Sequence, residues 1–263
     1  MGLIFMLIKS IDIQNTPVYL IGDLHTNYKE FKERFEADKS LKDCTFIFLG
    51  DMDFRDEETA YNQFKKLDKM LYERNIHSYV IRGNHDNPKF WEPNEFDWTF
   101  EEIMFWNKFD SFRPIGSHTR IKINNNIGII ISGAVTINRA DLTPGVNYWP
   151  EYDKVDMPPD FIDYGEGLKN IDFVIGHTGP VYSDIFKEQK TGCEKYLKDG
   201  FLVNDLENEQ KQLRSILKRY RPKRWYCGHY HFEKDTKYVW DNWSDDGVIH
   251  LKIVPKQGIL RIA

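Results

Sequence analysis

Short apolar runs, each closed by a nearby glycine, alternate with amphipathic segments through the first third of the chain. β-Branched and aromatic residues dominate these runs, which is typical of buried strands. We predict three such strands, at residues 18–21, 45–49 and 78–81. Between them, apolar residues recur at helical spacing, and helices are expected over 28–37 and 59–74. This βαβαβ order favours a parallel sheet with ligand-binding loops at the carboxyl ends of its strands.

The pattern changes after residue 119. Two alternating segments around Asn125 and Asn126 predict a β-hairpin. Residues 138–170 have no regular period, and a loop of that length inside a domain is usually functional or disordered. We favour a functional loop. Further strands are expected at 173–175, 225–227, 237–240 and 248–254, with a helix at 204–220. We therefore predict one α/β domain over residues 1–263, a four-layer α/β/β/α sandwich of two mixed sheets flanked by helices.

Composition and charge narrow the class of protein. The 263 residues are 41% hydrophobic and 29% charged, which is typical of a soluble globular protein. A formal charge of -5 gives no general positive field that would attract nucleic acid or anionic lipid. Three scattered cysteines argue against a disulfide framework, so we expect a cytoplasmic protein. No apolar stretch is long enough to predict a membrane span.

Five short polar motifs follow the predicted strands. They are IGDLH at 21–25, LGDMDFR at 49–55, RGNHD at 82–86, GHT at 176–178 and GHYH at 228–231. Five of the eight histidines lie in these motifs, together with Asp23, Asp51 and Asn84. Taken singly, each of these residues could serve a turn. Imidazole and oxygen groups that converge from several strand ends are instead typical of a divalent transition-metal site.

The ordered set of motifs resembles the calcineurin-like metallophosphoesterase family, whose pattern is GDxH, GDxxDR, GNHD or GNHE, GH and GHxH. The resemblance extends from Gly22 to His231. It implies two divalent metal ions (Mn, Fe, Zn or Ni) and hydrolysis of a phosphate ester by a metal-bridging hydroxide. By motif position, the first metal would be held by Asp23, His25 and His231, the second by Asn84, His177 and His229, and Asp51 would bridge them.

The same resemblance implies catalytic and substrate-binding residues. His85 matches the family residue that protonates the leaving group or stabilises the phosphoryl oxygens. Arg55 matches the family arginine and, with Arg82, is expected to bind phosphate oxygens. Where the family has an aspartate that orients the histidine, this chain has Phe54. Asp53, the catalytic candidate, is then one of three aspartates that could take that role, with Asp56 and Asp86 as the others.

The long loop offers a further candidate. Arg139 is followed by the aromatic pair Tyr148 and Trp149, which resembles a segment in some bacterial and phage phosphoesterases. We predict that Arg139 binds phosphate and that the aromatic rings stack on a base. A purely structural role for these side chains is equally open, because aromatic residues commonly anchor long loops.

The sequence leaves three functions open. The first is hydrolysis of a phosphomonoester, such as a nucleotide, a nucleic-acid end or a phosphoprotein. The RGNHD motif favours it, because the motif resembles that of the protein-phosphatase-like members of the family. The second is a phosphodiesterase or nuclease on the same scaffold, which the aromatic loop and the basic residues near 218–224 would suit. The third is a metal-binding scaffold protein without activity, for which Phe54 is the only support.

Overall fold

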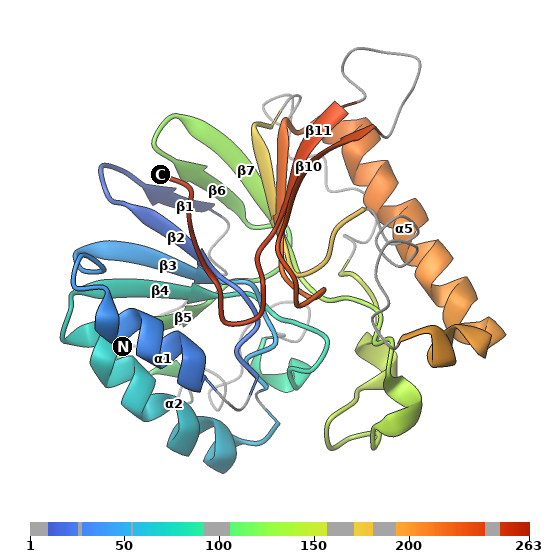
Figure 1. Ribbon diagram of the computed structural model, residues 1–263, viewed down its shortest axis with the longest axis horizontal. Helices are drawn as coiled ribbons and strands as arrows, with labels where there is room; N and C mark the ends of the chain where they lie inside the picture. Colours follow the sequence, from blue (N-terminus) through green and yellow to red (C-terminus); the bar gives the residue numbers. More distant parts are fainter. Residues whose placement is uncertain are drawn as a thin grey trace, which may run out of the picture.

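Two β-sheets lie at the centre of the molecule, with helices on their outer faces (Figure 1). The computed structural model describes residues 10–25, 28–53, 55–91, 106–156, 171–180, 193–239 and 248–263. Five strands form the smaller sheet, in the order β12 (Ile259–Arg261), β2 (Val18–Ile21), β3 (Cys44–Phe48), β4 (Ile76–Val80) and β5 (Phe112–Pro114). Strands β2 to β5 run parallel and β12 runs antiparallel to β2.

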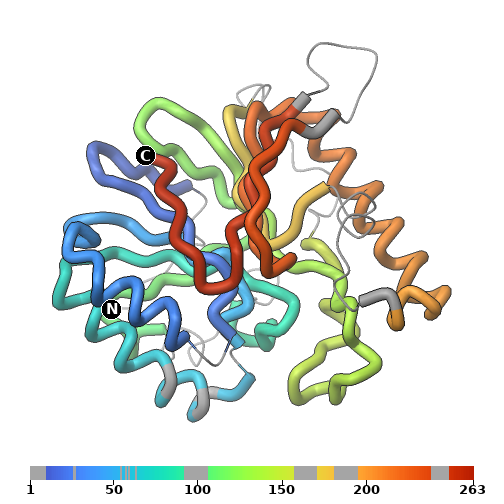
Figure 2. Tube along the Cα trace, viewed as in Figure 1, coloured from blue at the N-terminus to red at the C-terminus, as the bar shows by residue number. Residues whose placement is uncertain are grey.

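The larger sheet has seven strands and is also mixed. Its order is β1 (Ser10–Ile13), β6 (Arg120–Ile123), β7 (Asn126–Ile131), β8 (Phe173–Gly176), β9 (Arg224–Cys227), β11 (Val248–Ile253) and β10 (Lys234–Val239). The four central strands, β7, β8, β9 and β11, are parallel to one another. Figure 2 shows the end of the chain, in red, passing from β11 of this sheet back to the smaller one.

Three apolar layers hold the sheets and helices together. One lies between the smaller sheet and helices α1 (Lys29–Ala37) and α2 (Glu57–Tyr72), where phenylalanines such as Phe46 and Phe64 are fully buried. A second joins the facing sides of the two sheets. The third packs helix α5 (Gly200–Tyr220) against the larger sheet, around Trp225. This arrangement confirms the predicted α/β sandwich of two mixed sheets flanked by helices.

The boundaries differ from the predictions in places. Helix α5 begins four residues earlier than expected, at Gly200, where the Asp199 side chain accepts hydrogen bonds from two backbone N–H groups. Strand β10 is shifted toward the amino terminus, and residue 240 lies outside the described residues. Strands β1, β5 and β12 were not predicted. The long loop contains two short 3₁₀ helices, Arg139–Asp141 and Pro150–Tyr152, while residues 157–170 lie outside the described part.

Candidate metal centre

The loops that carry the five motifs meet at one end of the sandwich. Asp23 and His25 follow β2, Asp51 follows β3 and Asn84 follows β4, all from the smaller sheet. His177 follows β8, and His229 and His231 follow β9 of the larger sheet. Because these strands are parallel within each sheet, their carboxyl ends lie at the same edge. The structure thus brings together residues as far apart in sequence as Asp23 and His231.

Two clusters of candidate ligands share one carboxylate. Ligand atoms of Asp23, His25, Asp51 and His231 all lie within 4.8 Å of one another, and so do those of Asp51, His177 and His229. Asn84 adjoins the second cluster, with its Oδ1 atom 2.9 Å from Nε2 of His177. Asp51 belongs to both clusters, as expected for a residue between two cations.

Glycines allow the strand ends to approach this closely. A Cβ atom on Gly83 would lie 2.1 Å from Oδ1 of Asp51, and one on Gly228 would lie 2.3 Å from Oδ1 of Asp23. Both distances are far below van der Waals contact, so any other residue there would displace a candidate ligand. The glycines of the motifs therefore set the spacing between neighbouring loops.

Several candidate ligands adopt backbone angles that side chains other than glycine rarely take. Positive φ values occur at His25 (49°), Asp51 (50°), His229 (65°) and His231 (60°), and at the neighbouring Asp53 (65°). Each such residue costs on the order of 1 kcal/mol and persists only where the surrounding structure determines it. Strained residues of this kind among candidate ligands are typical of a functional site.

In the first cluster, the ring nitrogens converge on one carboxylate. Nε2 of His25 lies 2.9 Å from Nε2 of His231, which is in turn 3.2 Å from Oδ2 of Asp23. The backbone N–H of His229 donates to both oxygens of Asp23, at 3.1 and 3.0 Å. These contacts fix the carboxylate so that it faces the two rings.

In the second cluster, a backbone carbonyl sets the orientation of a ring. Nδ1 of His177 donates to the carbonyl oxygen of Leu49 at 2.6 Å, which directs Nε2 toward the site. That Nε2 atom lies 3.4 Å from Oδ1 of Asp51. The backbone N–H of His85 also donates to Oδ1 of Asp51, at 2.9 Å. Hydrogen bonds thus orient this cluster too.

The electrostatics of the site favour ionised carboxylates. Burial opposes ionisation of Asp51, but His177 and His85 outweigh it and hold the pKa of Asp51 well below its ordinary value. The pKa of Asp23 is lowered in the same way, against burial, chiefly by His231 and His177. Burial lowers the pKa of His25 to about 4.

The buried histidines of the second cluster differ in charge. Burial lowers the pKa of His229 to about 3, and His177 adds to the effect. Burial acts in the same direction on His177, but Asp51 and Asp23 reverse it and raise the pKa of His177 to about 9. At neutral pH the site therefore contains two carboxylates and the imidazolium of His177, beside the neutral rings of His25 and His229.

This donor set fits divalent transition metals. Its atoms are carboxylate and amide oxygens and imidazole nitrogens, which suit Mn, Fe, Zn and Ni. Asp23, Asp51 and His177 are at most 1% exposed, and buried charged or polar groups of this kind are normally paired or bound to metal. The residues present are thus those that a pair of cations would require.

Of the predicted catalytic residues, His85 contacts the clusters, whereas Arg55 and Asp53 pair with each other. His85 is half-buried, and its ring centroid is 5.5 Å from that of His25. Arg55 donates from Nε and Nη2 to the two oxygens of Asp53, at 2.7 and 2.8 Å. The Arg55 side chain is 39% exposed, so part of its guanidinium faces solvent.

The three aspartates considered for His85 have different surroundings. Asp53 binds Arg55, Asp86 accepts a hydrogen bond from the backbone N–H of Gly83 at 2.8 Å, and Asp56 is exposed. Phe54 lies outside the described residues. The identity of the aspartate that orients His85 therefore stays a prediction.

The other two predicted phosphate-binding arginines pair with carboxylates. Arg82 is 2% exposed and forms an ion pair with Asp156. Arg139 donates to Asp153 at 3.3 Å and to Asp205 of α5 at 2.7 Å. These contacts connect the long loop to the rest of the molecule, and they favour positioning roles for both arginines.

The aromatic pair of the loop is also engaged in structure. The hydroxyl of Tyr148 donates to Asp153 at 3.0 Å, and the Tyr148 side chain is buried. Burial raises the pKa of Asp153, against the hydrogen bonds from Thr136 and Tyr148 and the charge of Arg139. The predicted base-stacking role stays a prediction, but the Tyr148 contact favours anchoring of the loop.

Three buried polar residues near the site were not predicted from sequence. Thr136 and Asp153 lie in the loop after β7, and nothing in their local sequence distinguishes them. Glu209 lies on the buried face of α5, where its Oε1 accepts the backbone N–H of Val135 at 2.6 Å. A glutamate among the apolar positions of that helix is a signal that periodicity could have revealed.

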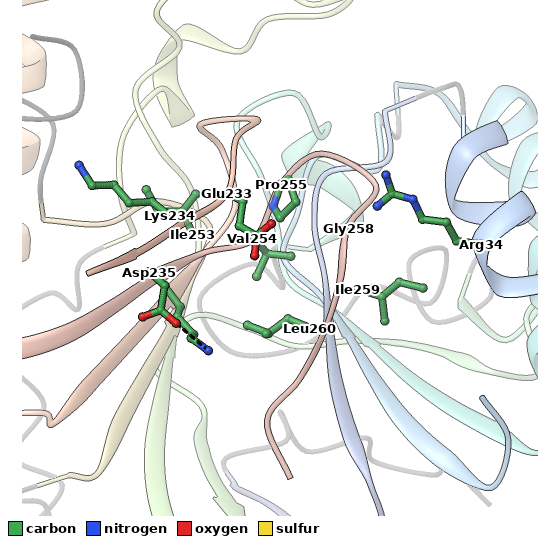
Figure 3. A pocket seen from close by; sticks show the side chains of 11 residues that line it. Arg34, Glu233, Lys234, Asp235, Ile253, Val254, Pro255, Gly258, Ile259 and Leu260 are labelled. Carbon is green, nitrogen blue, oxygen red and sulfur yellow. Dashed lines mark ion pairs between the residues drawn. The ribbon is translucent and has the colours of Figure 1, made fainter. Parts of the chain in front are cut away.

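A hollow of about 130 Å³ lies elsewhere, between the edge strands β10 and β12 (Figure 3). Charged side chains of both signs line it, among them Asp235 and Lys252, which form an ion pair at 2.9 Å. Its lining includes no residue of the two clusters. The candidate metal centre is therefore separate from this hollow.

Two packed mixed sheets with oxygen and imidazole groups gathered at their strand ends form a candidate metal-binding site. A family model for calcineurin-like phosphoesterases matches residues 16–233, and the chain belongs to that family. This confirms the resemblance noted in the sequence.

Comparison with solved structures supports the fold. In total, 43 chains match, and one crystal structure is 12% identical to this chain with a TM-score of 0.50. The match covers 92% of this chain and 91% of the other, and it shows a likeness of fold alone. No curated protein matches the sequence. In the described part of the chain, no helix has the length and apolar character needed to cross a membrane.

Proposed function

We propose that this protein uses two divalent cations to hydrolyse a phosphate ester, with a phosphomonoester as the favoured substrate. The observation that carries the proposal is the pair of ligand clusters that share Asp51. Asp23, His25 and His231 would hold one cation, and Asn84, His177 and His229 the other. When bound, the cations would supply Lewis acidity that neutralises phosphoryl oxygens and lowers the pKa of water.

The charge of the site supports a phosphomonoester. Asp23 and Asp51 are the only carboxylates among the seven proposed ligands, so two divalent cations would leave the site with a net positive charge. A dianionic phosphomonoester benefits more from that charge than a monoanionic diester does. A nucleotide, a nucleic-acid end and a phosphoprotein all meet this requirement, and we place the reaction in the cytoplasm.

Arg55 and Asp53 would act as a pair in substrate binding. Within the described residues, Asp53 holds two of the five N–H donors of Arg55, and the other donors would bind phosphate oxygens. Because Asp53 is only 3% exposed, it provides a fixed anchor for a partly exposed guanidinium. We propose Arg55 as the phosphate-binding residue and Asp53 as the residue that positions it.

His85 would move a proton. Its ring borders the first cluster, and its backbone N–H is tied to Asp51, so the ring is held beside the reacting ester. Donation of a proton to the leaving oxygen is the role that this placement favours.

Substitution of the shared carboxylate tests the proposal. Asp51→Asn removes a charge from both clusters, and we expect hydrolysis of p-nitrophenyl phosphate in Mn²⁺ to fall at least about a hundredfold, since even outer-shell partners of a metal commonly contribute 10–100-fold. Asp110→Asn, at an exposed aspartate far from the motifs in sequence, is the matched control. Undiminished turnover in Asp51→Asn would end the proposal.

A parallel assay separates the two ester classes. Rates with p-nitrophenyl phosphate and bis-p-nitrophenyl phosphate are compared for the same enzyme and metal. We expect the monoester to be faster, because it carries the larger negative charge. A faster diester would favour the phosphodiesterase alternative, and inactivity toward both esters despite bound metal would favour a scaffold protein.

A further inference from the structure

The amide of Asn84 has one end that can bind a cation and one that cannot. Its oxygen is an acceptor, whereas its NH₂ group donates two hydrogens and would repel a metal ion. The Asn84 side chain is only 6% exposed, so water does not freely compete for either end. Metal binding at the second cluster therefore depends on which way the amide faces.

Thr136 and His177 contact opposite ends of this amide. Nδ2 of Asn84 donates to Oγ1 of Thr136 at 3.1 Å, and Oδ1 then faces Nε2 of His177 at 2.9 Å. Thr136 is 1% exposed, so its hydroxyl must find its partners within the protein. Its hydroxyl also lies beside the carboxylate of Asp153, whose pKa it acts to lower.

The chemistry of these three groups fixes the direction of each hydrogen bond. The ion pair with Arg139 favours the ionised form of Asp153. An ionised carboxylate only accepts, so the single hydroxyl hydrogen of Thr136 is directed to Asp153. The hydroxyl oxygen then has only lone pairs to offer to Asn84. Asn84 must therefore donate from its NH₂ group, so its oxygen faces the proposed metal position.

Asp153 is itself held from several sides. It accepts the backbone N–H of Thr136 at 2.6 Å and the hydroxyl of Tyr148 at 3.0 Å. Arg139 pairs with it at 3.3 Å and connects it to Asp205 on helix α5. With only 3% of its side chain exposed, Asp153 is a fixed acceptor rather than a mobile one.

We propose that Thr136 is a positioning residue that orients Asn84 as a ligand of the second cation, and that Asp153 sets the polarity of the Thr136 hydroxyl. The inference rests on the proposed function, since it takes Asn84 to be a metal ligand. Thr136 itself touches neither metal nor substrate. It acts through Asn84 alone, and that is the property to test.

Thr136→Val keeps the shape of the side chain and removes the hydroxyl. Calorimetric titration of the metal-free protein with Mn²⁺ alone should show the second binding step weakened by about 10–100-fold, the usual effect of losing an outer-shell partner. The first step should be unchanged, because the first cluster includes neither Asn84 nor Thr136. Thr136→Ser retains the hydroxyl and should restore the second step.

A double-mutant cycle separates positioning from general stability. In an Asn84→Ala background the amide is gone, so Thr136→Val should have no further effect on Mn²⁺ affinity. A loss of the same size in both backgrounds would overturn the inference, as would unchanged affinity in the single Thr136→Val variant. Thermal unfolding of each metal-free variant shows whether it is folded, and Thr136→Ser supplies the comparison if Thr136→Val is not.

Failure of the inference and failure of the proposed function give different results. If the wild-type protein binds two Mn²⁺ ions but hydrolyses no ester, the proposed function is wrong. The double-mutant cycle then still decides the role of Thr136. An active wild type whose Mn²⁺ affinity is insensitive to Thr136→Val overturns the inference alone. A wild type that binds no Mn²⁺ overturns both.

Discussion

At the scale of single residues, His85 differs from its neighbours in the site, because they would bind metal and it would not. His85 belongs to neither ligand cluster, although its ring lies beside His25 and its backbone N–H binds Asp51. Its side chain is therefore free for proton transfer or for contact with phosphoryl oxygens. These two roles respond differently to the leaving group, since only a poor leaving group needs protonation.

His85→Asn is expected to slow hydrolysis of phenyl phosphate by about 10²- to 10⁴-fold, the usual contribution of a general acid. The loss should be much smaller for p-nitrophenyl phosphate, whose leaving group departs without a proton. Steady-state rates with both esters in Mn²⁺ measure the difference, and calorimetry checks that metal binding is retained. His77→Asn, at an exposed histidine of β4, is the control.

Equal losses for the two esters would contradict the proton-donor role of His85. They would favour a contact between His85 and the phosphoryl oxygens instead, because such a contact acts on every substrate alike. Unchanged rates with both esters would show that His85 takes no part in the reaction.

At the scale of secondary structure, helix α5 places a carboxyl group inside the protein. Glu209 is 3% exposed, and burial raises its pKa to about 8. The group is thus mainly protonated in the folded protein at neutral pH, while in the unfolded chain it ionises near its ordinary value of 4.5. Its Oε1 atom accepts the backbone N–H of Val135, one residue before Thr136, so α5 also supports the loop beside the metal centre.

The raised pKa of Glu209 predicts how stability depends on pH. The folded state binds this proton more tightly than the unfolded state, so the stabilisation is fully present below about pH 4.5 and is lost as pH rises through about 8. Glu209→Gln keeps an oxygen for Val135 but cannot ionise. The stability difference between wild type and variant should therefore shift in favour of the variant by on the order of a few kcal/mol between pH 4.5 and 9.

Urea unfolding in chelator at several pH values measures this shift without contributions from metal. Glu207→Gln, at an exposed position of the same helix, controls for the loss of one carboxylate. A Glu209→Gln profile parallel to that of wild type would show that Glu209 has no raised pKa in the folded protein.

The sequence predicted the central strands better than the edge strands. Strands β2 and β3 are largely apolar and buried because both faces of a central parallel sheet are covered, and β4 keeps apolar residues at its buried first and last positions. The three missed strands, β1, β5 and β12, have only three or four residues and lie at sheet edges. β5 even contains Pro114, which an edge tolerates and a central strand does not. Pairing at an edge depends on the neighbouring strand more than on local sequence.

For the site, too, the sequence predicted residues that a local pattern marks better than residues whose roles depend on distant contacts. Asp51, Asn84 and His177 occupy motif positions after strands, so a local pattern marks them. Thr136, Asp153 and Glu209 are important because of contacts with distant residues. Arg139 shows the limit of the pattern, because its partner Asp205 is 66 positions away on another element and no local feature predicts the pair.

At the scale of the whole molecule, the proposed metal ions would join the two sheets. Asp23, Asp51 and Asn84 lie on loops of the five-stranded sheet, whereas His177, His229 and His231 lie on loops of the seven-stranded sheet. Each cluster contains residues from both sheets, so each cation would act as a cross-link. The unfolded chain does not hold these side chains together, and metal should therefore bind the folded state preferentially.

Mn²⁺ is consequently expected to stabilise the protein against unfolding. At a free concentration one hundred times the dissociation constant, each independent site contributes about 2.7 kcal/mol, which raises the unfolding midpoint, and chelator should reverse the increase. Asp51→Asn should lose most of this stabilisation because Asp51 serves both clusters, while Asn84→Ala should lose about half because it affects only the second. Thermal denaturation of the three proteins with Mn²⁺ and with chelator measures the effect. Equal midpoints for wild type under the two conditions would contradict the cross-link, and equal losses in the two variants would contradict the assignment of Asn84 to one cation only.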